Sequence, residues 1–148
     1  MQIFLPYINI IEVAKCLDNR RLHKQIVECY QIMKAIKGES EAWKNHPICK
    51  MYKNNLKFLE AYTKTLELYK ELSKNTTDSV LKNRMEVANK EAMSLIPSFI
   101  TEEYLSTMKG RLYVKDSSHY AVFAPYEQFG DQNMYFVDDE WRIYKQKV

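Results

Sequence analysis

Hydrophobic residues recur three or four positions apart along most of the chain, which is the spacing of amphipathic helices. The clearest stripe follows Asp18, a residue type that favours helix N-caps, and ends before Gly38, which suits a helix C-terminus. Its apolar members are Leu22, Ile26, Cys29, Met33 and Ile36. The pattern therefore predicts one unbroken helix from Asp18 to about Ile36, with this face buried.

Similar stripes predict the other elements. Four further helices are expected: two turns capped by Asn9, a long helix from Pro47 to about Leu72, a helix from Asp78 to about Ser94, and a last one from Thr101 to Tyr113. After Tyr113 the helical period stops, and the aromatic-rich residues 114–134 are expected to form a loop. Residues 135–144 have the pattern of a small hairpin that turns at residues 138–140.

Length and composition place these elements in one domain. The chain has 148 residues, of which 46% are hydrophobic and 28% charged, ordinary values for a globular protein with a real core. We therefore predict an all-α fold, a compact helical bundle that forms a single domain over residues 1–148. An irregular, aromatic-rich wrap and a small terminal hairpin complete the expected architecture.

Composition and cysteine spacing also argue against membrane, secreted and zinc-binding proteins. No apolar run reaches transmembrane length, and the first residues lack the features of a signal peptide, so no membrane partner is expected. Cys16, Cys29 and Cys49 have neither CxxC nor zinc spacing, which indicates free thiols in a reducing compartment and no zinc site. We expect a cytoplasmic protein of a bacterial or phage-infected cell. The sequence carries no signal for an oligomeric state.

The polar side of the 18–36 helix carries a cationic face. Arg21, Lys24 and Glu28 share one side of the helix, and Arg20 and Gln25 flank them. Residues 1–75 contain 13 lysines and arginines against 8 acidic residues, so the basic half of the chain includes this helix. This charge favours a phosphate-bearing partner, either DNA or a nucleotide. The alternative is a solvated face on which Lys24 and Glu28 form a weak pair.

Five residues outside the helical stripes are candidates for nucleic-acid or nucleotide binding: Trp43, Asn45, His46, His119 and Tyr120. Loop aromatics can stack on bases, and loop histidines can change charge near neutral pH. Structural roles are the alternative, with His46 at a helix cap, Trp43 as a loop anchor and His119 in a structural hydrogen bond. We expect several of the five to converge near Glu28, around a pocket that accepts a flipped base or a nucleotide.

Four short blocks carry a family resemblance. They are Met-Gln-Ile-Phe-Leu-Pro at residues 1–6, LD-x-x-RL-x-KQ-x-x-E at residues 17–28, Trp-x-Asn-His-Pro at residues 43–47 followed by Met51, and DSSHY at residues 116–120. Together they resemble the pyrimidine-dimer DNA glycosylase family, also called phage-type endonuclease V. The similarity is closest to a bacterial and phage branch of that family that opens with Met-Gln-x-Phe-Leu-Pro, and it covers about residues 1–62 well.

The resemblance implies an all-α domain without metal or cofactor that acts on ultraviolet-damaged DNA as a glycosylase and AP lyase. In this family the free α-amine at the chain start attacks C1′ of the damaged nucleotide and forms an imine. A glutamate of the signature helix assists, and β-elimination nicks the strand. That glutamate falls on Glu28 here. Because Gln2 is too large for ordinary removal of the initiator methionine, the amine implied is that of Met1.

An α-amine and a carboxylate also suit this chemistry on physical grounds. The α-amine has a pKa near 8, well below that of lysine, so a usable fraction is neutral and nucleophilic at pH 7. A nearby carboxylate can stabilise a developing oxocarbenium charge and transfer protons.

Two other functional classes remain as alternatives to a glycosylase. One is a non-catalytic module that binds nucleic acid or sequesters a nucleotide signal of the host, and the other is a structural helical domain.

Overall fold

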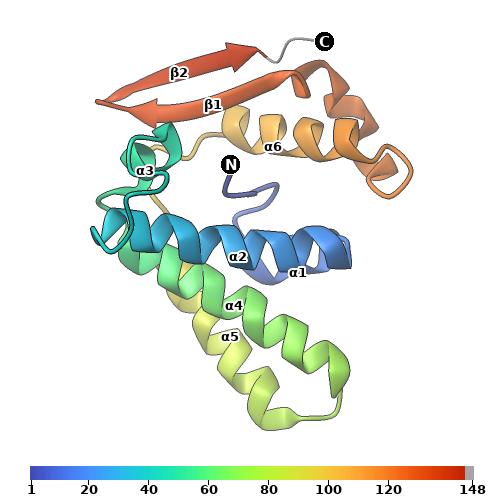
Figure 1. Ribbon diagram of the computed structural model, residues 1–148. Helices are drawn as coiled ribbons and strands as arrows, with labels where there is room; N and C mark the ends of the chain where they lie inside the picture. Colours follow the sequence, from blue (N-terminus) through green and yellow to red (C-terminus); the bar gives the residue numbers. More distant parts are fainter. Residues whose placement is uncertain (146–148) are drawn as a thin grey trace.

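The structure is a computed structural model that describes residues 1–145, a mostly helical chain that ends in a two-stranded antiparallel hairpin (Figure 1). The hairpin consists of β1 (Gln132–Val137) and β2 (Glu140–Lys145). The predicted helical bundle with a terminal hairpin is therefore confirmed, whereas the description all-α is wrong in the strict sense. Residues 146–148, which the sequence prediction placed in the same domain, lie outside the described residues.

The first two helices begin and end where their capping residues predict. α1 (Ile10–Cys16) starts after Asn9, whose side-chain oxygen accepts a hydrogen bond from the Glu12 amide at 3.3 Å. α2 (Asn19–Ile36) starts after Asp18 and is followed by Gly38, whose φ of 77° is left-handed. The side chain of Asp18 makes no capping bond to α2, because the side chains of Arg21 and Tyr120 donate to it instead.

The long helix expected from Pro47 to about Leu72 is wrong, because the chain forms two helices there. α3 (Pro47–Tyr52) and α4 (Leu56–Lys74) are separated by residues 53–55, and Asn55 has a non-helical φ of −127°. Apolar residues keep helical spacing across this break, so periodicity alone does not reveal it. Asparagine side chains compete with helical backbone hydrogen bonds, which favours a break at Asn54-Asn55. The break allows α3 to pack against α2 and β1.

The later helices confirm their predicted caps, and the C-terminal segment is more regular than expected. Asp78 caps α5 (Ser79–Ser94), and Thr101 caps α6 (Glu102–Lys115). Residues 121–129, expected to be a loop, form the 3₁₀-helix η1 (Ala121–Phe129), whose short period escapes a search for α-helical spacing. The hairpin starts three residues earlier than expected, and its predicted turn is confirmed at Asp138-Asp139, where both φ angles are positive.

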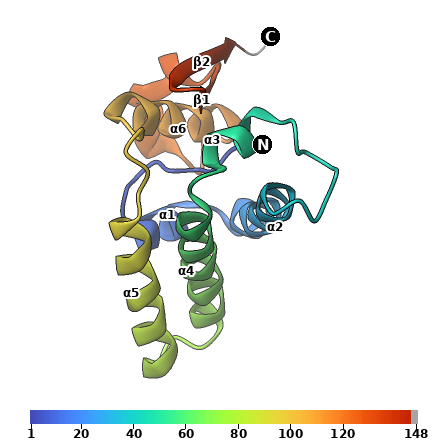
Figure 2. The same ribbon diagram turned by 90° about the vertical axis from the view of Figure 1, so that its left-hand side faces the viewer.

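The elements lie in two layers that enclose the start of the chain. α1, α2, α4 and α5 form one layer, and α6, η1 and the hairpin form the other, with the N-terminus between α2 and α6 (Figures 1 and 2). The irregular segment of residues 1–5 contributes Ile3 and Leu5 to the core, both fully buried. The fold therefore places the terminal amine beside the polar face of α2.

Candidate functional site

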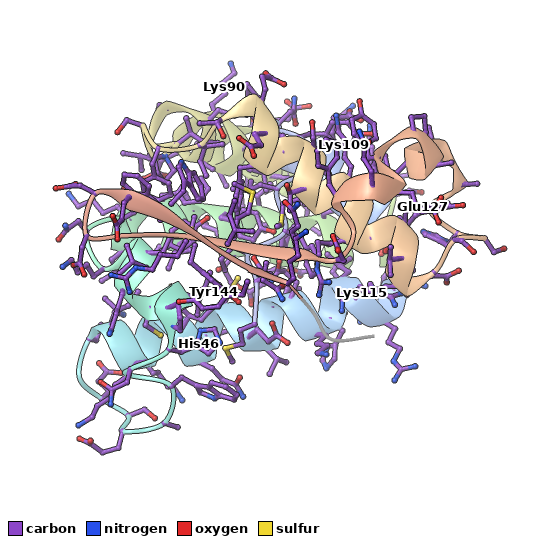
Figure 3. The ribbon with its side chains drawn as sticks, turned by 90° about the horizontal axis from the view of Figure 1, so that it is seen from above. His46, Lys90, Lys109, Lys115, Glu127 and Tyr144 are labelled. Atoms are coloured by element: carbon purple, nitrogen blue, oxygen red, sulfur yellow. The ribbon has the colours of Figure 1, made fainter. Side chains whose placement is uncertain are left out.

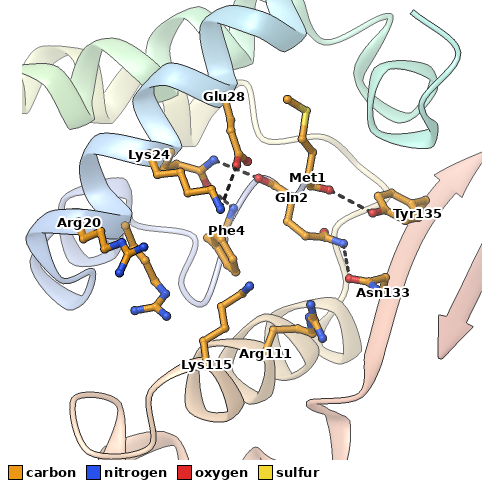
Figure 4. Close-up of a pocket in the computed structure, with 12 residues that line it drawn as sticks. Met1, Gln2, Phe4, Arg20, Lys24, Glu28, Arg111, Lys115, Asn133 and Tyr135 are labelled. Atoms are coloured by element: carbon orange, nitrogen blue, oxygen red, sulfur yellow. Dashed lines mark hydrogen bonds and ion pairs between the residues drawn. The ribbon is translucent and has the colours of Figure 1, made fainter. Parts of the chain in front are cut away.

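A polar cavity of about 380 Å³ opens between the two layers. Figure 4 shows it bounded by α2, the first residues of the chain, α6 and β1. Its lining residues are Met1, Gln2, Phe4, Arg20, Arg21, Lys24, Gln25, Glu28, Arg111, Lys115, Asn133 and Tyr135. The volume lies within the range of natural small-ligand pockets, and it is large enough for one nucleotide.

The predicted face of α2 supplies one wall of the cavity. Arg20, Arg21, Lys24, Gln25 and Glu28 all line it, because residues three, four and seven apart project from one side of a helix. The amine of Lys24 lies 3.8 Å from the carboxylate of Glu28. The Lys24 side chain is 69% exposed and that of Glu28 only 16%, so the pair is weak and leaves the carboxylate available to the cavity.

The opposite wall comes from α6, which the sequence reasoning missed. Arg111 and Lys115 project from it into the cavity (Figure 4). Arg111 is 5% exposed, and its Nη1 donates to the Gly130 carbonyl at 2.9 Å, while its Nε has no partner. Desolvation, and then the charge of nearby cations, lower the pKa of Lys115. The i, i+4 spacing of the two cations was the available sequence signal.

The α-amine of Met1 faces the same cavity. Desolvation by burial lowers its pKa below the ordinary 8.0, and the charge of Glu28 partly opposes this shift. Among the described residues, no ion pair joins the amine to Glu28, so the nitrogen and the carboxylate oxygens are more than 4.0 Å apart. The cavity thus brings together a partly desolvated amine and a carboxylate that are not in contact.

Gln25 lies deeper than the sequence suggested. It was expected on the flank of the cationic face, yet it is 1% exposed and binds the start of the chain. Its Oε1 accepts a hydrogen bond from the Phe4 amide at 2.6 Å, and its Nε2 donates to the Gln2 carbonyl at 3.0 Å. The side chain therefore satisfies one backbone N–H and one carbonyl of the chain start. This explains why a polar residue is buried on α2.

The structure does not bring the three predicted residues of the 43–46 segment into the cavity lining. The ring of Trp43 is 46% exposed and meets the His46 ring edge-on at 5.7 Å, and Asn45 is exposed. His46 caps α3, because its Nδ1 accepts a hydrogen bond from the Ile48 amide at 3.0 Å. The His46 ring also packs against Tyr135 at 5.7 Å, so it supports the cavity from behind.

His119 and Tyr120 do not line the cavity either. The His119 ring nitrogen lies 3.2 Å from the Cys16 carbonyl, which is the structural role named as the alternative. Tyr120 is 1% exposed, and its hydroxyl donates to Asp18, whose carboxylate also binds Arg21 at 3.1 Å. The guanidinium of Arg21 stands 5.7 Å from the centre of the Tyr120 ring. Tyr120 thus packs against Arg21, which does line the cavity.

The described residues contain no group of three or more His, Cys, Asp or Glu side chains that could hold a metal ion. Within residues 1–145, no helix has both the length and the apolar character needed to cross a membrane.

Most charged side chains of the cavity lining are cations, and they come from α2 and α6. Lys109 also belongs to α6 but projects from its other side (Figure 3), where it lies over the rings of Tyr7 and Tyr126.

Comparison with known proteins gives a match to one family. The sequence model described as pyrimidine dimer DNA glycosylase matches residues 1–75. This range contains Met1 and the whole polar face of α2, and it ends before α6 and the hairpin. No curated protein and no solved structure gives a significant match.

Proposed function

Because the chain belongs to the pyrimidine dimer DNA glycosylase family, we propose that it excises the damaged base from DNA and then nicks the strand as an AP lyase. In this proposal the α-amine of Met1 is the nucleophile, and Glu28 is the carboxylate that assists it. The family implies damaged DNA as the substrate.

The observation that carries the proposal is the shared position of the amine and Glu28 at one basic cavity. Burial lowers the pKa of the Met1 amine, so a larger fraction is neutral near pH 7 than for an ordinary α-amine. Because the amine and the carboxylate are more than 4.0 Å apart, a sugar carbon can lie between them. Both features support an amine that attacks C1′.

The bonds that form and break follow from this arrangement. The amine lone pair attacks C1′, and the glycosidic bond breaks with its electron pair on the departing base, which is then protonated. The sugar ring opens as O4′ takes a proton, and the amine nitrogen forms an imine with C1′. Loss of a 2′ proton then expels the 3′ phosphate, which nicks the strand. Glu28 would stabilise the positive charge that develops on the sugar and accept a proton.

The remaining lining residues suit the DNA backbone. Arg20, Arg21 and Lys24 stand on one wall, and Arg111 and Lys115 stand on the other. Cations on two sides of a cavity attract phosphates and can hold a strand while a nucleotide leaves the stack. Arg111 has no carboxylate partner among the described residues. This buried, unpaired cation supports an anionic ligand in the cavity.

Borohydride trapping tests the mechanism. The reagent should lock the protein to abasic or dimer-containing DNA by reducing the imine, and peptide mapping should place the adduct on Met1. The amine should be verified by N-terminal sequencing beforehand, and its acetylation should abolish trapping. An adduct on Lys115, the other amine with a lowered pKa in the cavity, would keep the lyase but overturn the proposed nucleophile.

Glu28→Gln tests the role of the carboxylate. This change keeps size and removes charge, so turnover should fall by roughly two orders of magnitude or more, while DNA affinity stays equal or rises. The matched control is Glu60→Gln on α4, an exposed residue whose only ion pair is with Lys37 at 3.9 Å within the described chain. Equal turnover of the Glu28→Gln variant and the wild type would contradict the assignment.

A free nucleotide is the second candidate ligand, because the cavity has nucleotide size and five cationic side chains. A non-catalytic module of this kind would bind an intact nucleotide and would need no accessible amine. Tight nucleotide binding by isothermal titration calorimetry, together with no trapping on either DNA, would favour this function over the glycosylase.

A further inference from the structure

Side chains from four separate elements hold the first four residues of the chain. Each carbonyl oxygen of residues 1–4 accepts one hydrogen bond from such a side chain. The donors, in order, are Tyr135 of β1, Gln25 of α2, Tyr104 of α6 and Tyr62 of α4, at 3.1, 3.0, 3.1 and 2.6 Å. The chain start is thus fixed by elements on every side of it.

These bonds replace a strand partner. Residues 1–4 have no regular secondary structure and belong to neither strand of the hairpin, yet they lie against the core, where a carbonyl without a partner would be costly. The four side-chain donors satisfy these carbonyls one by one from different elements, so each of the first four residues is held individually.

Tyr135 bonds to the residue that carries the amine. Its ring is 7% exposed and packs edge-on against His46 at 5.7 Å and Tyr144 at 5.9 Å, which fixes the direction of its hydroxyl. Two residues earlier on the same face of β1, Asn133 accepts a hydrogen bond from the Gln2 side chain at 3.0 Å. Two bonds therefore connect the first two residues to β1 (Figure 4).

We infer that Tyr135 is a positioning residue for the Met1 amine, holding it at the cavity across from Glu28. This inference rests on the proposed role of Met1 as nucleophile. Gln25, Tyr104 and Tyr62 hold residues 2–4, but without the Tyr135 bond the Met1 peptide plane can rotate and carry the amine with it. A displacement of about 1 Å at a reacting atom can cost roughly a hundredfold in rate.

The surroundings of the amine provide an independent readout. The charged groups that face it are Glu28 and Lys24 on α2, and Lys115 and Arg111 on α6. The amine charge also acts on His46, the cap of α3: burial, and then this charge, lower the pKa of the His46 ring. Desolvation is the main cause of the lowered amine pKa. An amine released from its anchor becomes more hydrated, so its pKa should rise toward 8.0.

The test is Tyr135→Phe, which removes the hydroxyl and keeps the ring. Single-turnover borohydride trapping on abasic DNA should slow by roughly ten- to a hundredfold, while the Kd for duplex DNA stays unchanged. The pKa of the amine, measured without DNA from the pH dependence of its arylation by fluorodinitrobenzene, should rise. The control is Tyr144→Phe, which removes a neighbouring phenol that bonds to no residue of the described chain start and should leave both readouts unchanged.

The two readouts separate this inference from the proposed function. A wild type that traps no DNA, with an amine pKa that still rises in Tyr135→Phe, would reject the nucleophile and support the positioning. Unchanged pKa and trapping in Tyr135→Phe would overturn the inference. If Tyr135→Phe lowers the Tm strongly, Asn133→Ala decides, because loss of the Gln2 bond should shift both readouts in the same direction by a smaller factor, and no shift would again overturn it.

Discussion

At the scale of single residues, the roles of Glu28 and the Met1 amine depend on the charged side chains around them. The Glu28 side chain is 16% exposed, and the other charged side chains of the cavity lining are the cations Arg20, Arg21, Lys24, Arg111 and Lys115. A carboxylate placed among cations at a cavity is suited to stabilise positive charge that develops on a sugar. Burial lowers the pKa of the Met1 amine; the charge of Glu28 opposes this shift, and Lys115, Lys24 and Arg111 add to it.

The pH dependence of imine formation is the prediction at this scale. The neutral amine reacts, and it predominates above its pKa, so the trapping rate should rise with pH and level off. Because burial lowers the amine pKa, the midpoint of this rise should lie below 8.0. The measurement is single-turnover trapping on abasic DNA over a pH series. A midpoint above 8.0 would show an amine that is exposed or held by a carboxylate.

At the scale of elements, α6 owes its position to a close contact with η1. Gly110 lies where a Cβ would stand 2.3 Å from the Tyr126 carbonyl oxygen and 3.0 Å from the Gly130 amide nitrogen. Both are backbone atoms, which cannot move aside cheaply. This contact sets how α6 presents Arg111, the next residue, to the cavity.

Gly110→Ala should therefore destabilise the protein despite the better helix propensity of alanine. The propensity gain is about 1 kcal/mol, whereas forced repacking of backbone costs about 1–3 kcal/mol and the separation here is severe. We expect a lower Tm in thermal unfolding followed by circular dichroism. Ser106→Ala on the same helix is the control and should leave the Tm nearly unchanged. An equal or higher Tm for Gly110→Ala would contradict the described contact.

At the scale of the whole molecule, the cavity exists because two layers face each other across the chain start. The polar face of α2 belongs to the first 75 residues, which match the family, whereas α6 and β1 follow later in the chain. The tertiary structure joins these two regions into one basic surface that neither forms alone. Phosphates held by both walls would lie on either side of the Met1 amine and Glu28.

Salt dependence tests this two-walled arrangement. The affinity for duplex DNA should fall with salt, and Arg20→Ala and Lys115→Ala should each flatten the log–log slope by about one, because each removes one phosphate contact. Lys109→Ala is the control, since that side chain leaves α6 on another side and packs on Tyr7 and Tyr126. A slope changed by Arg20→Ala but not by Lys115→Ala would restrict the DNA contact to α2.

The sequence determined the features that depend on near neighbours in the chain. Helical spacing with the capping residues Asn9, Asp18, Asp78 and Thr101 located four helices. The same spacing placed Arg21, Lys24 and Glu28 on one face of α2, with Arg20 on its flank. The short blocks at residues 1–6, 17–28, 43–47 and 116–120 together pointed to the family that the match over residues 1–75 confirms. Local periodicity and motif spacing are written in consecutive residues, so they need no knowledge of the fold.

Tertiary structure alone decided which distant residues meet. The break before α4 lies inside an unbroken apolar stripe, and the burial of Gln25 depends on a segment that is 23 positions away. Tyr135 reaches Met1 across 134 positions, and Arg111 and Lys115 face α2 only because α6 folds over the chain start. His46 and His119 met the sequence criteria for a site, yet one ring nitrogen of each bonds to a backbone group. Such contacts depend on how whole layers pack, which no short stretch of sequence encodes.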